Sequence, residues 1–193
     1  IIGGGQVIGL GNITSVIENG LSANTTYYYK IWSNDGTSYS SGLNANATTP
    51  CGITTTFPIN EGFEGAVIPN CWTNDSTDVL DWSINSGGTT SRNTGPSDDV
   101  SGGGNYIYME TSGSSAGDSA MLTTGNIDIS SLTSPTLRLY SHMYGGSIGE
   151  LSVWITDASG TTSQVFIKNG DQGNQWVVEY IDLAGYSGIV NFT

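Results

Sequence analysis

Apolar and polar residues alternate along several short segments of this chain, which is typical of strands with one buried face. The clearest of these segments are Tyr27–Trp32, Tyr106–Met109, Leu137–Met143, Leu151–Ile155, Gln164–Ile167 and Trp176–Ile181. Clusters of Gly, Asn, Asp and Ser separate them, and no window keeps apolar residues at helical spacing over three turns. Many short strands with turn signals between them predict an all-β fold, an antiparallel sandwich.

The composition changes near Thr48–Pro50, where a strand-like stretch ends in a short Thr/Pro linker. We therefore predict one unit over residues 1–50 and a second over residues 51–193. The first unit has about half of the roughly 100 residues that an immunoglobulin-type sandwich needs. Three strands cannot bury both faces of such a core, so we expect this unit to be unstable alone. Its remaining strands would come from upstream residues or from another chain.

Charged residues make up only 11% of the 193 residues, and the net charge is −13. Nucleic-acid binding depends on Lys and Arg that neutralise phosphates, so this balance excludes nucleic acid and anionic membrane surfaces as partners. No apolar run approaches the ~20 residues that span a bilayer, so no insertion into a membrane is expected.

Two cysteines, Cys51 and Cys71, have 19 residues between them in the sequence. A disulfide between them would stabilise the fold by roughly 3 kcal/mol through loop closure. Two free buried thiols are the alternative. A high Ser, Thr and Asn content with few Lys residues favours an exported protein, in which such a bridge persists.

The residues offer little for catalysis. His142 is the single histidine, whereas catalytic triads and His-rich zinc sites need an imidazole held by several partners. No Gly-x-Ser-x-Gly elbow, His-Glu-x-x-His motif or phosphate loop occurs. A pair of carboxylates across a cleft, as in glycosidases, is left open by the sequence. We predict no catalytic residue, no organic cofactor and no enzyme activity.

The stretch Leu21–Ile31 places a Leu, a Thr and a Tyr at the spacing of a strand corner, and this resembles the corner of fibronectin type III domains. The resemblance implies that Tyr27 is the corner tyrosine, with its hydroxyl bonded to upstream backbone. It also implies that residues 1–50 are the C-terminal part of a fibronectin type III-like domain, with a closing strand before Pro50.

A series of motifs follows Cys51 in a fixed order. They are Glu61–Gly65, Cys71–Trp72, Leu80–Trp82, Thr94–Asp99, Gly104–Glu110, Gly117–Leu122, Leu139–Gly145, Gly149–Val153 and Gly173–Trp176. Together they resemble the MAM domain, an extracellular jelly-roll module. The resemblance implies a jelly-roll antiparallel β-sandwich over residues 51–193, truncated because the family's last strand would follow Thr193. The long spacing from Cys51 to Phe63 is similar to secreted bacterial versions, in which Cys51 would pair with Cys71.

The same resemblance implies a structural cation. Glu64 and Asp99 match family positions near a cation at the edge of the sandwich, and Ca²⁺ (or Na⁺) prefers such oxygen ligands. Asp98 is either a further ligand or a solvated loop charge. The alternative is a hydrogen-bonded glutamate without a metal. His142 matches a position that the family keeps for structure.

Aromatic residues divide into two groups. The resemblance assigns the core positions to Trp72, Trp82, Trp154 and Trp176. Trp32 alternates outward with Tyr28 and Lys30, so we predict that it is exposed and stacks on a sugar or a protein partner. The alternative is that the absent half of the sandwich or the neighbouring domain covers Trp32.

Two short segments, Asp75–Thr77 and Asp118–Ala120, resemble a bacterial O-glycosylation pattern, which implies modification of Ser76 or Ser119. Burial of Ser119 within a strand is the alternative.

These features predict a non-catalytic interaction or adhesion region of an extracellular, secreted or cell-surface bacterial protein. Its partners would be proteins or glycans at the cell surface or in the extracellular matrix, with homotypic contacts included. Two alternatives stay open: a carbohydrate-binding accessory module of a secreted hydrolase or peptidase, and a subunit of an extracellular assembly completed by strands from its neighbours.

Overall fold

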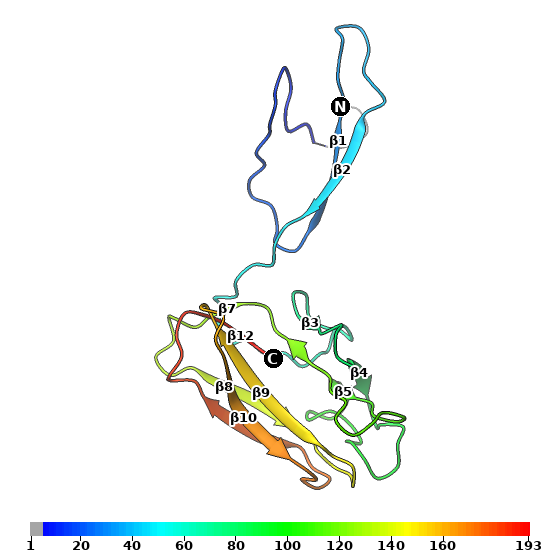
Figure 1. Cartoon of the computed structure of the whole chain (residues 1–193), viewed down its shortest axis with the longest axis vertical. Helices are drawn as coiled ribbons and strands as arrows, with labels where there is room; N and C mark the ends of the chain where they lie inside the picture. The colour runs from blue at the N-terminus through cyan, green and yellow to red at the C-terminus, as the bar shows by residue number, and fades with distance from the viewer. Residues whose placement is uncertain (1–5) are drawn as a thin grey trace. The chain divides into compact units, whose positions relative to one another are not determined.

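The computed structural model describes residues 6–193, and strands are the only regular secondary structure over that range. The described chain divides after Gly52 into two compact units (Figure 1). No described segment forms a helix that is long and apolar enough to cross a membrane. The prediction of an all-β fold is confirmed.

The first unit is built around an antiparallel pair of strands, β1 (Thr26–Ile31) and β2 (Leu43–Thr48). Residues opposite each other share a face, so Tyr29 and Ala45 lie on an apolar face and Tyr28 and Asn46 on a polar face. The Oη atom of Tyr27 accepts a hydrogen bond from the backbone N of Ser22 at 2.9 Å, which is the contact predicted for a tyrosine corner. The assignment of this unit to the fibronectin type III class stays a prediction.

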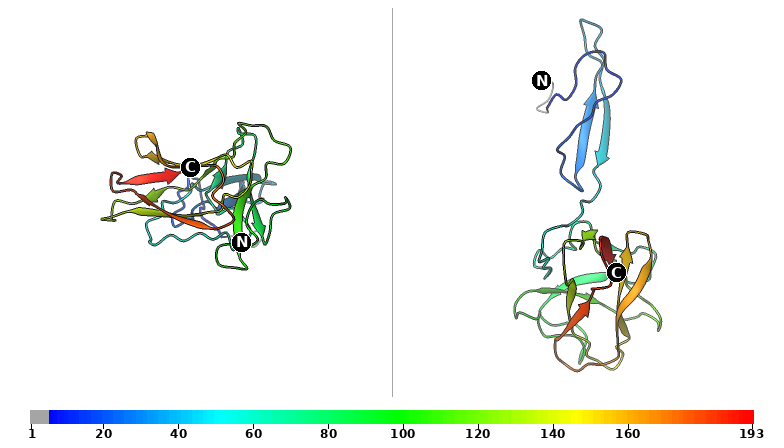
Figure 2. Two further views of the ribbon diagram at one scale, coloured as in Figure 1. Left: turned by 90° about the horizontal axis from the view of Figure 1, so that it is seen from below. Right: turned by 90° about the vertical axis from the view of Figure 1, so that its left-hand side faces the viewer.

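The second unit contains ten strands, of which five lie in the segments that alternation predicts. They are β3 (Thr73–Asn74), β4 (Trp82–Ser86), β5 (Asn105–Met109), β6 (Leu122–Thr123), β7 (Ile127–Asp128), β8 (Thr136–Ser141), β9 (Glu150–Asp157), β10 (Thr162–Asn169), β11 (Val177–Asp182) and β12 (Ile189–Phe192). One sheet has the order β10-β9-β12-β7, and three antiparallel pairs, β11-β8, β3-β6 and β4-β5, complete the unit (Figures 1 and 2).

The main core lies between the four-stranded sheet and the β8-β11 pair. Ile155 of β9 and Val190 of β12 are almost completely buried, and Ile181 of β11 packs in the same cluster. Leu137 and Leu139 of β8 cover it from the side of the pair. The unit is therefore a two-layer sandwich over this core, as expected for a jelly roll.

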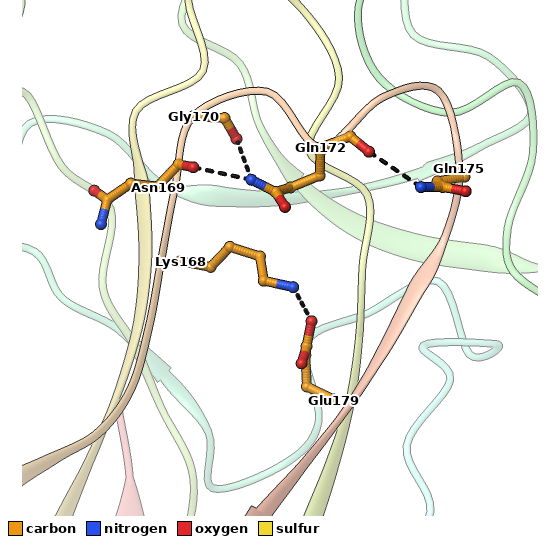
Figure 3. A network of polar contacts seen from close by, with 6 residues as sticks. All are labelled: Lys168, Asn169, Gly170, Gln172, Gln175 and Glu179. Carbon is orange, nitrogen blue, oxygen red and sulfur yellow. Dashed lines mark hydrogen bonds and ion pairs between the residues drawn. The ribbon is translucent and has the colours of Figure 1, made fainter.

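One ion pair crosses between the two layers. Lys168 of β10 binds Glu179 of β11, and both side chains are half-buried (Figure 3). Beside it, the side-chain amide of Gln172 donates to the carbonyls of Asn169 and Gly170, which orders the turn after β10 (Figure 3). The pair is inside the sandwich edge, where removal of one partner leaves a poorly solvated charge.

Cys51 and Cys71 form a disulfide, and the structure leaves no free cysteine among the described residues. The alternative of two free thiols is therefore wrong. The bridge closes the segment that precedes β3, a segment with little regular secondary structure of its own.

Candidate functional site

The candidate cation site lies where the loop ending at Gly104 enters β5. Asp99 in this loop is buried, and its carboxylate is held by three donors. Oδ2 accepts from the backbone N of Ser101 at 3.0 Å and from its Oγ at 2.6 Å, while Oδ1 accepts from the backbone N of Gly104 at 2.8 Å. These bonds fold the loop around the carboxylate.

The same hydrogen bonds control the charge of Asp99. The hydroxyl of Ser101 and the backbone N–H groups of Gly104 and Ser101 all favour the ionised carboxylate, and they lower its pKa from 3.8 to about 2. Burial acts in the opposite direction, and it is outweighed. Asp99 is therefore a fixed negative charge at neutral pH.

Glu64 approaches the same point from a distant part of the sequence. A Cβ added at Gly104 would lie 2.4 Å from Oε1 of Glu64 and 2.8 Å from Oδ2 of Asp99. The two carboxylates therefore converge over Gly104, and only a residue without a side chain fits between them. Asn105 holds Glu64 there, because its Nδ2 donates to the carbonyl of Glu64 at 3.3 Å. The structure thus brings together the two residues that the sequence proposed as ligands.

The donor set at this point is small. Among residues 6–193, no group of three or more His, Cys, Asp or Glu side chains is arranged to hold a metal. Asp98 directs its Oδ1 to the backbone N of Asp99 at 2.9 Å, and its carbonyl accepts from Nε1 of Trp176 at 3.0 Å. A cation over Gly104 would take two carboxylates from the chain and its other oxygens from backbone and water.

An aromatic cluster stands behind this loop. The rings of Tyr106 and Trp176 meet edge to face at 5.9 Å, and His142 contacts Trp176 at 5.4 Å and Tyr144 at 6.3 Å. Nε2 of His142 lies 3.1 Å from Oδ1 of Asn174, and burial lowers the pKa of the imidazole. The neighbours of His142, namely Asn174, Tyr144 and Trp176, are those of a packed side chain and include no nucleophile.

Two tryptophans differ from the expected exposure. Trp32 is half-buried rather than fully exposed, with Nζ of Lys30 at 5.5 Å from its ring centroid, and its role as a ligand contact stays a prediction. Trp154 was expected in the core, yet 38% of it is exposed on the outer side of β9. Trp72, Trp82 and Trp176 are half-buried. In β9 the residues Val153 and Ile155 point inward, so the strand pleat turns Trp154 outward.

Ser76 and Ser119 both lie exposed in loops of the second unit. Burial of Ser119 within a strand is therefore excluded, since β6 begins only at Leu122. Modification of either serine stays a prediction.

The outer face of the β8-β11 pair was not predicted as a functional surface. Tyr140 pairs with Val178 and Arg138 with Tyr180 across the two strands, and all four are exposed. Tyr180 is 69% exposed, and the guanidinium of Arg138 lies 5.3 Å from the ring centroid of Tyr140. In the sequence, Leu137 and Leu139 alternate with Arg138 and Tyr140, and this alternation could have predicted that Arg138 and Tyr140 face outward.

Comparison with known proteins agrees with this architecture. The family model described as "MAM domain, meprin/A5/mu" matches residues 62–190. The MAM domain-containing glycosylphosphatidylinositol anchor protein 2 of Mus musculus is 34% identical over 139 residues, which cover 63% of this chain and 14% of that protein. Its counterpart in Homo sapiens is 32% identical with the same coverage. Neuropilin-1a of Danio rerio is 32% identical over 99 residues, covering 49% of this chain and 11% of that protein.

The chain thus spans between about one ninth and one seventh of the length of these relatives. All three are animal proteins, and a bacterial source for this chain stays a prediction.

Proposed function

The chain belongs to the MAM family, and from this membership we propose that it is a non-catalytic interaction module that acts outside the cell, at a cell surface or in the extracellular matrix. The relatives from mouse and human are named as glycosylphosphatidylinositol anchor proteins, which is consistent with a place outside the cell. A disulfide in this chain suits the same oxidising compartment.

The observation that carries the proposal is the outer face of the β8-β11 pair, formed by Arg138, Tyr140, Val178 and Tyr180. Tyr and Arg are enriched at the centres of protein interfaces, where they supply most of the binding energy. The tyrosines cost little conformational entropy on binding, because each has only two side-chain torsions to fix. We propose that this face contacts a protein partner.

The scaffold under this face is rigid. Leu137, Leu139 and Ile181 alternate with the exposed residues and pack into the main core. The cation–π contact between Arg138 and Tyr140 fixes the guanidinium before any partner arrives. A preorganised surface loses less entropy on binding than a mobile loop.

The test is binding of the fluorescently labelled chain to intact animal cells, measured as a saturation curve. We expect Y180A to weaken binding at least tenfold and R138A to weaken it severalfold, with protease treatment of the cells abolishing the signal. Tyr28→Ala, at an 80% exposed tyrosine of the first unit, is the matched control. Equal binding by Y180A and Tyr28→Ala, or binding that survives proteolysis, would refute the proposed protein contact.

We also propose that Glu64 and Asp99 bind Ca²⁺ weakly as a brace between the loop before β5 and the segment around Glu64. Their convergence over Gly104 supports this, and two carboxylates suit an affinity of about 10⁻⁴–10⁻³ M, as in extracellular modules. The Tm in millimolar Ca²⁺ should be higher than the Tm in the presence of a chelator, and Glu64→Gln should remove this difference. A melt that does not respond to Ca²⁺ contradicts the brace.

A further inference from the structure

The outer face of the β10-β9-β12-β7 sheet carries one exposed aromatic ring beside several uncharged polar side chains, with the exposed Ile167 on the same face opposite Ser152. Trp154 lies on the central strand β9, directly opposite Gln164 of β10. One step along the sheet, Thr156 is opposite Thr162 on one side and Asn191 of β12 on the other. Because paired residues share a face, these side chains form one continuous surface, the Trp154 face, together with Ser152.

The indole is held in a fixed orientation. Its Nε1 donates to Oγ of Ser152 at 3.1 Å, so the polar atom of the ring is already used within the strand. What the ring offers to a ligand is therefore its π face. The neighbouring hydroxyls of Thr156 and Thr162 are bonded to each other at 2.8 Å and keep further lone pairs for a ligand.

Gln164 supplies the free hydrogen-bonding group of this face. It is exposed, and its side-chain amide forms no hydrogen bond with any described residue. An amide offers two donors and two acceptor lone pairs at one position, which matches a hydroxyl group that both donates and accepts. Gln164 lies directly across from the indole, so a ligand on the ring is within its reach.

The charge of the surface selects among ligands. None of Ser152, Trp154, Thr156, Thr162, Gln164 and Asn191 ionises, although the whole chain carries a net charge of −13. An anionic ligand would be repelled by the chain as a whole, and a cationic one finds no carboxylate among these six side chains, the nearest on this face of β9 being Glu150, two residues before Ser152. An uncharged ligand with an apolar face and many hydroxyls meets no such penalty.

We propose that the Trp154 face binds a neutral glycan, with one pyranose ring stacked on the indole and its hydroxyls bonded to Gln164 and the flanking Thr and Asn side chains. The C–H face of a pyranose is apolar and packs on an aromatic ring, while its equatorial hydroxyls point sideways to the polar neighbours. This site is separate from the protein-binding face proposed above, since it lies on the other sheet of the sandwich.

The test uses the full chain and a panel of neutral hexasaccharides, namely cello-, xylo-, manno- and laminarihexaose, with hexagalacturonate as the acidic member. Binding is followed by two-dimensional NMR of the indole N–H groups, since the five tryptophans give separate signals. We expect at least one neutral hexasaccharide to shift the Trp154 signal and saturate it, and hexagalacturonate to leave it unchanged.

Two variants locate the site. Trp154→Ala should weaken binding at least tenfold and Gln164→Ala at least threefold, while Trp154→Phe should retain part of the affinity because it keeps an aromatic face. Tyr28→Ala, at an exposed tyrosine of the first unit, is the matched control and should bind as the unaltered chain does. Thermal melts establish that each variant is folded, and Gln164, being exposed, can be replaced without loss of packing.

The proposal is overturned if no neutral hexasaccharide shifts the Trp154 signal, or if Trp154→Ala binds as tightly as Tyr28→Ala. It is also overturned if the acidic member binds best. Loss of cell binding by Y180A with glycan binding intact would leave this site standing, so the two proposals fail independently.

Discussion

Gly104 gives the sharpest test of the carboxylate arrangement. Replacing it with alanine introduces a Cβ 2.4 Å from Oε1 of Glu64, 2.8 Å from Oδ2 of Asp99 and 3.0 Å from its Cγ. These separations are far below van der Waals contact, so at least one neighbour has to move. Glu64 is exposed and can swing away, but Asp99 is buried and held by Ser101 and by the backbone of Gly104 itself.

The expected cost is that of overpacking, about 1–3 kcal/mol. For a unit of this size that corresponds to a fall of about 3–10 °C in Tm. Urea unfolding followed by tryptophan fluorescence measures it, because four of the five tryptophans lie in the second unit.

The matched control is Gly149→Ala. Gly149 also directly precedes a strand, and a Cβ built there meets nothing within 4 Å. We expect Gly149→Ala to change the unfolding free energy by less than about 0.5 kcal/mol. Combining Gly104→Ala with Glu64→Ala removes the nearest contact only, so the double variant should stay destabilised through Asp99. If Gly104→Ala is as stable as Gly149→Ala, the carboxylates do not converge as described.

Four further measurements follow from the second unit. Cys71→Ser should lower the unfolding free energy by about 3 kcal/mol, the loop-closure value for this spacing, and a reducing agent should have the same effect on the unaltered chain but none on the variant. Ile155→Ala should cost about 2–5 kcal/mol in urea unfolding, because the side chain is fully buried, whereas a change below about 1 kcal/mol would place it outside the core. The pKa of Asp99 is lower in the folded chain than in the unfolded chain, so its contribution to stability should be complete above about pH 4 and disappear as pH falls through about 2. The unfolding free energy of Asp99→Asn, measured across this range beside that of the unaltered chain, tests this. Burial lowers the pKa of His142, so the unfolded chain binds its proton more readily, and stability should fall as pH drops below about 6.5; His142→Gln should flatten that decline.

Alternation was a reliable guide where strands are long and cover a core. Each of the segments Leu137–Met143, Leu151–Ile155 and Gln164–Ile167 overlaps a strand, because apolar residues at every second position have one way to be buried together. The short strands β3, β6 and β7 have two residues each, which is too few to carry a period. They are strands only because a neighbour pairs with them, as when Thr73 meets Thr123.

The candidate cation site depended on long-range folding in the same way. Family resemblance singled out Glu64 and Asp99, but nothing local in the sequence indicates that both approach Gly104. The hydrogen bonds of Asp99 are different, because all of its donors lie within five residues of it. That part of the site is encoded locally, and the contact with Glu64 is not.

Trp154 shows where two kinds of sequence argument conflict. Matching to family positions assigned it to the core, whereas the pleat of Leu151, Val153 and Ile155 assigns it to solvent, and Val153 and Ile155 are buried. Successive side chains of a strand point to opposite faces of the sheet, so only every second residue can be buried against one core. The two buried neighbours of Trp154 therefore decide its orientation. The indole of Trp154 is therefore available to a ligand, which is what the glycan proposal requires. Trp154→Thr tests this orientation. The unfolding free energy of the variant should stay within about 1 kcal/mol of that of the unaltered chain, because β-branched residues suit exposed strand positions. A larger loss would mean that the indole supports the fold rather than a ligand.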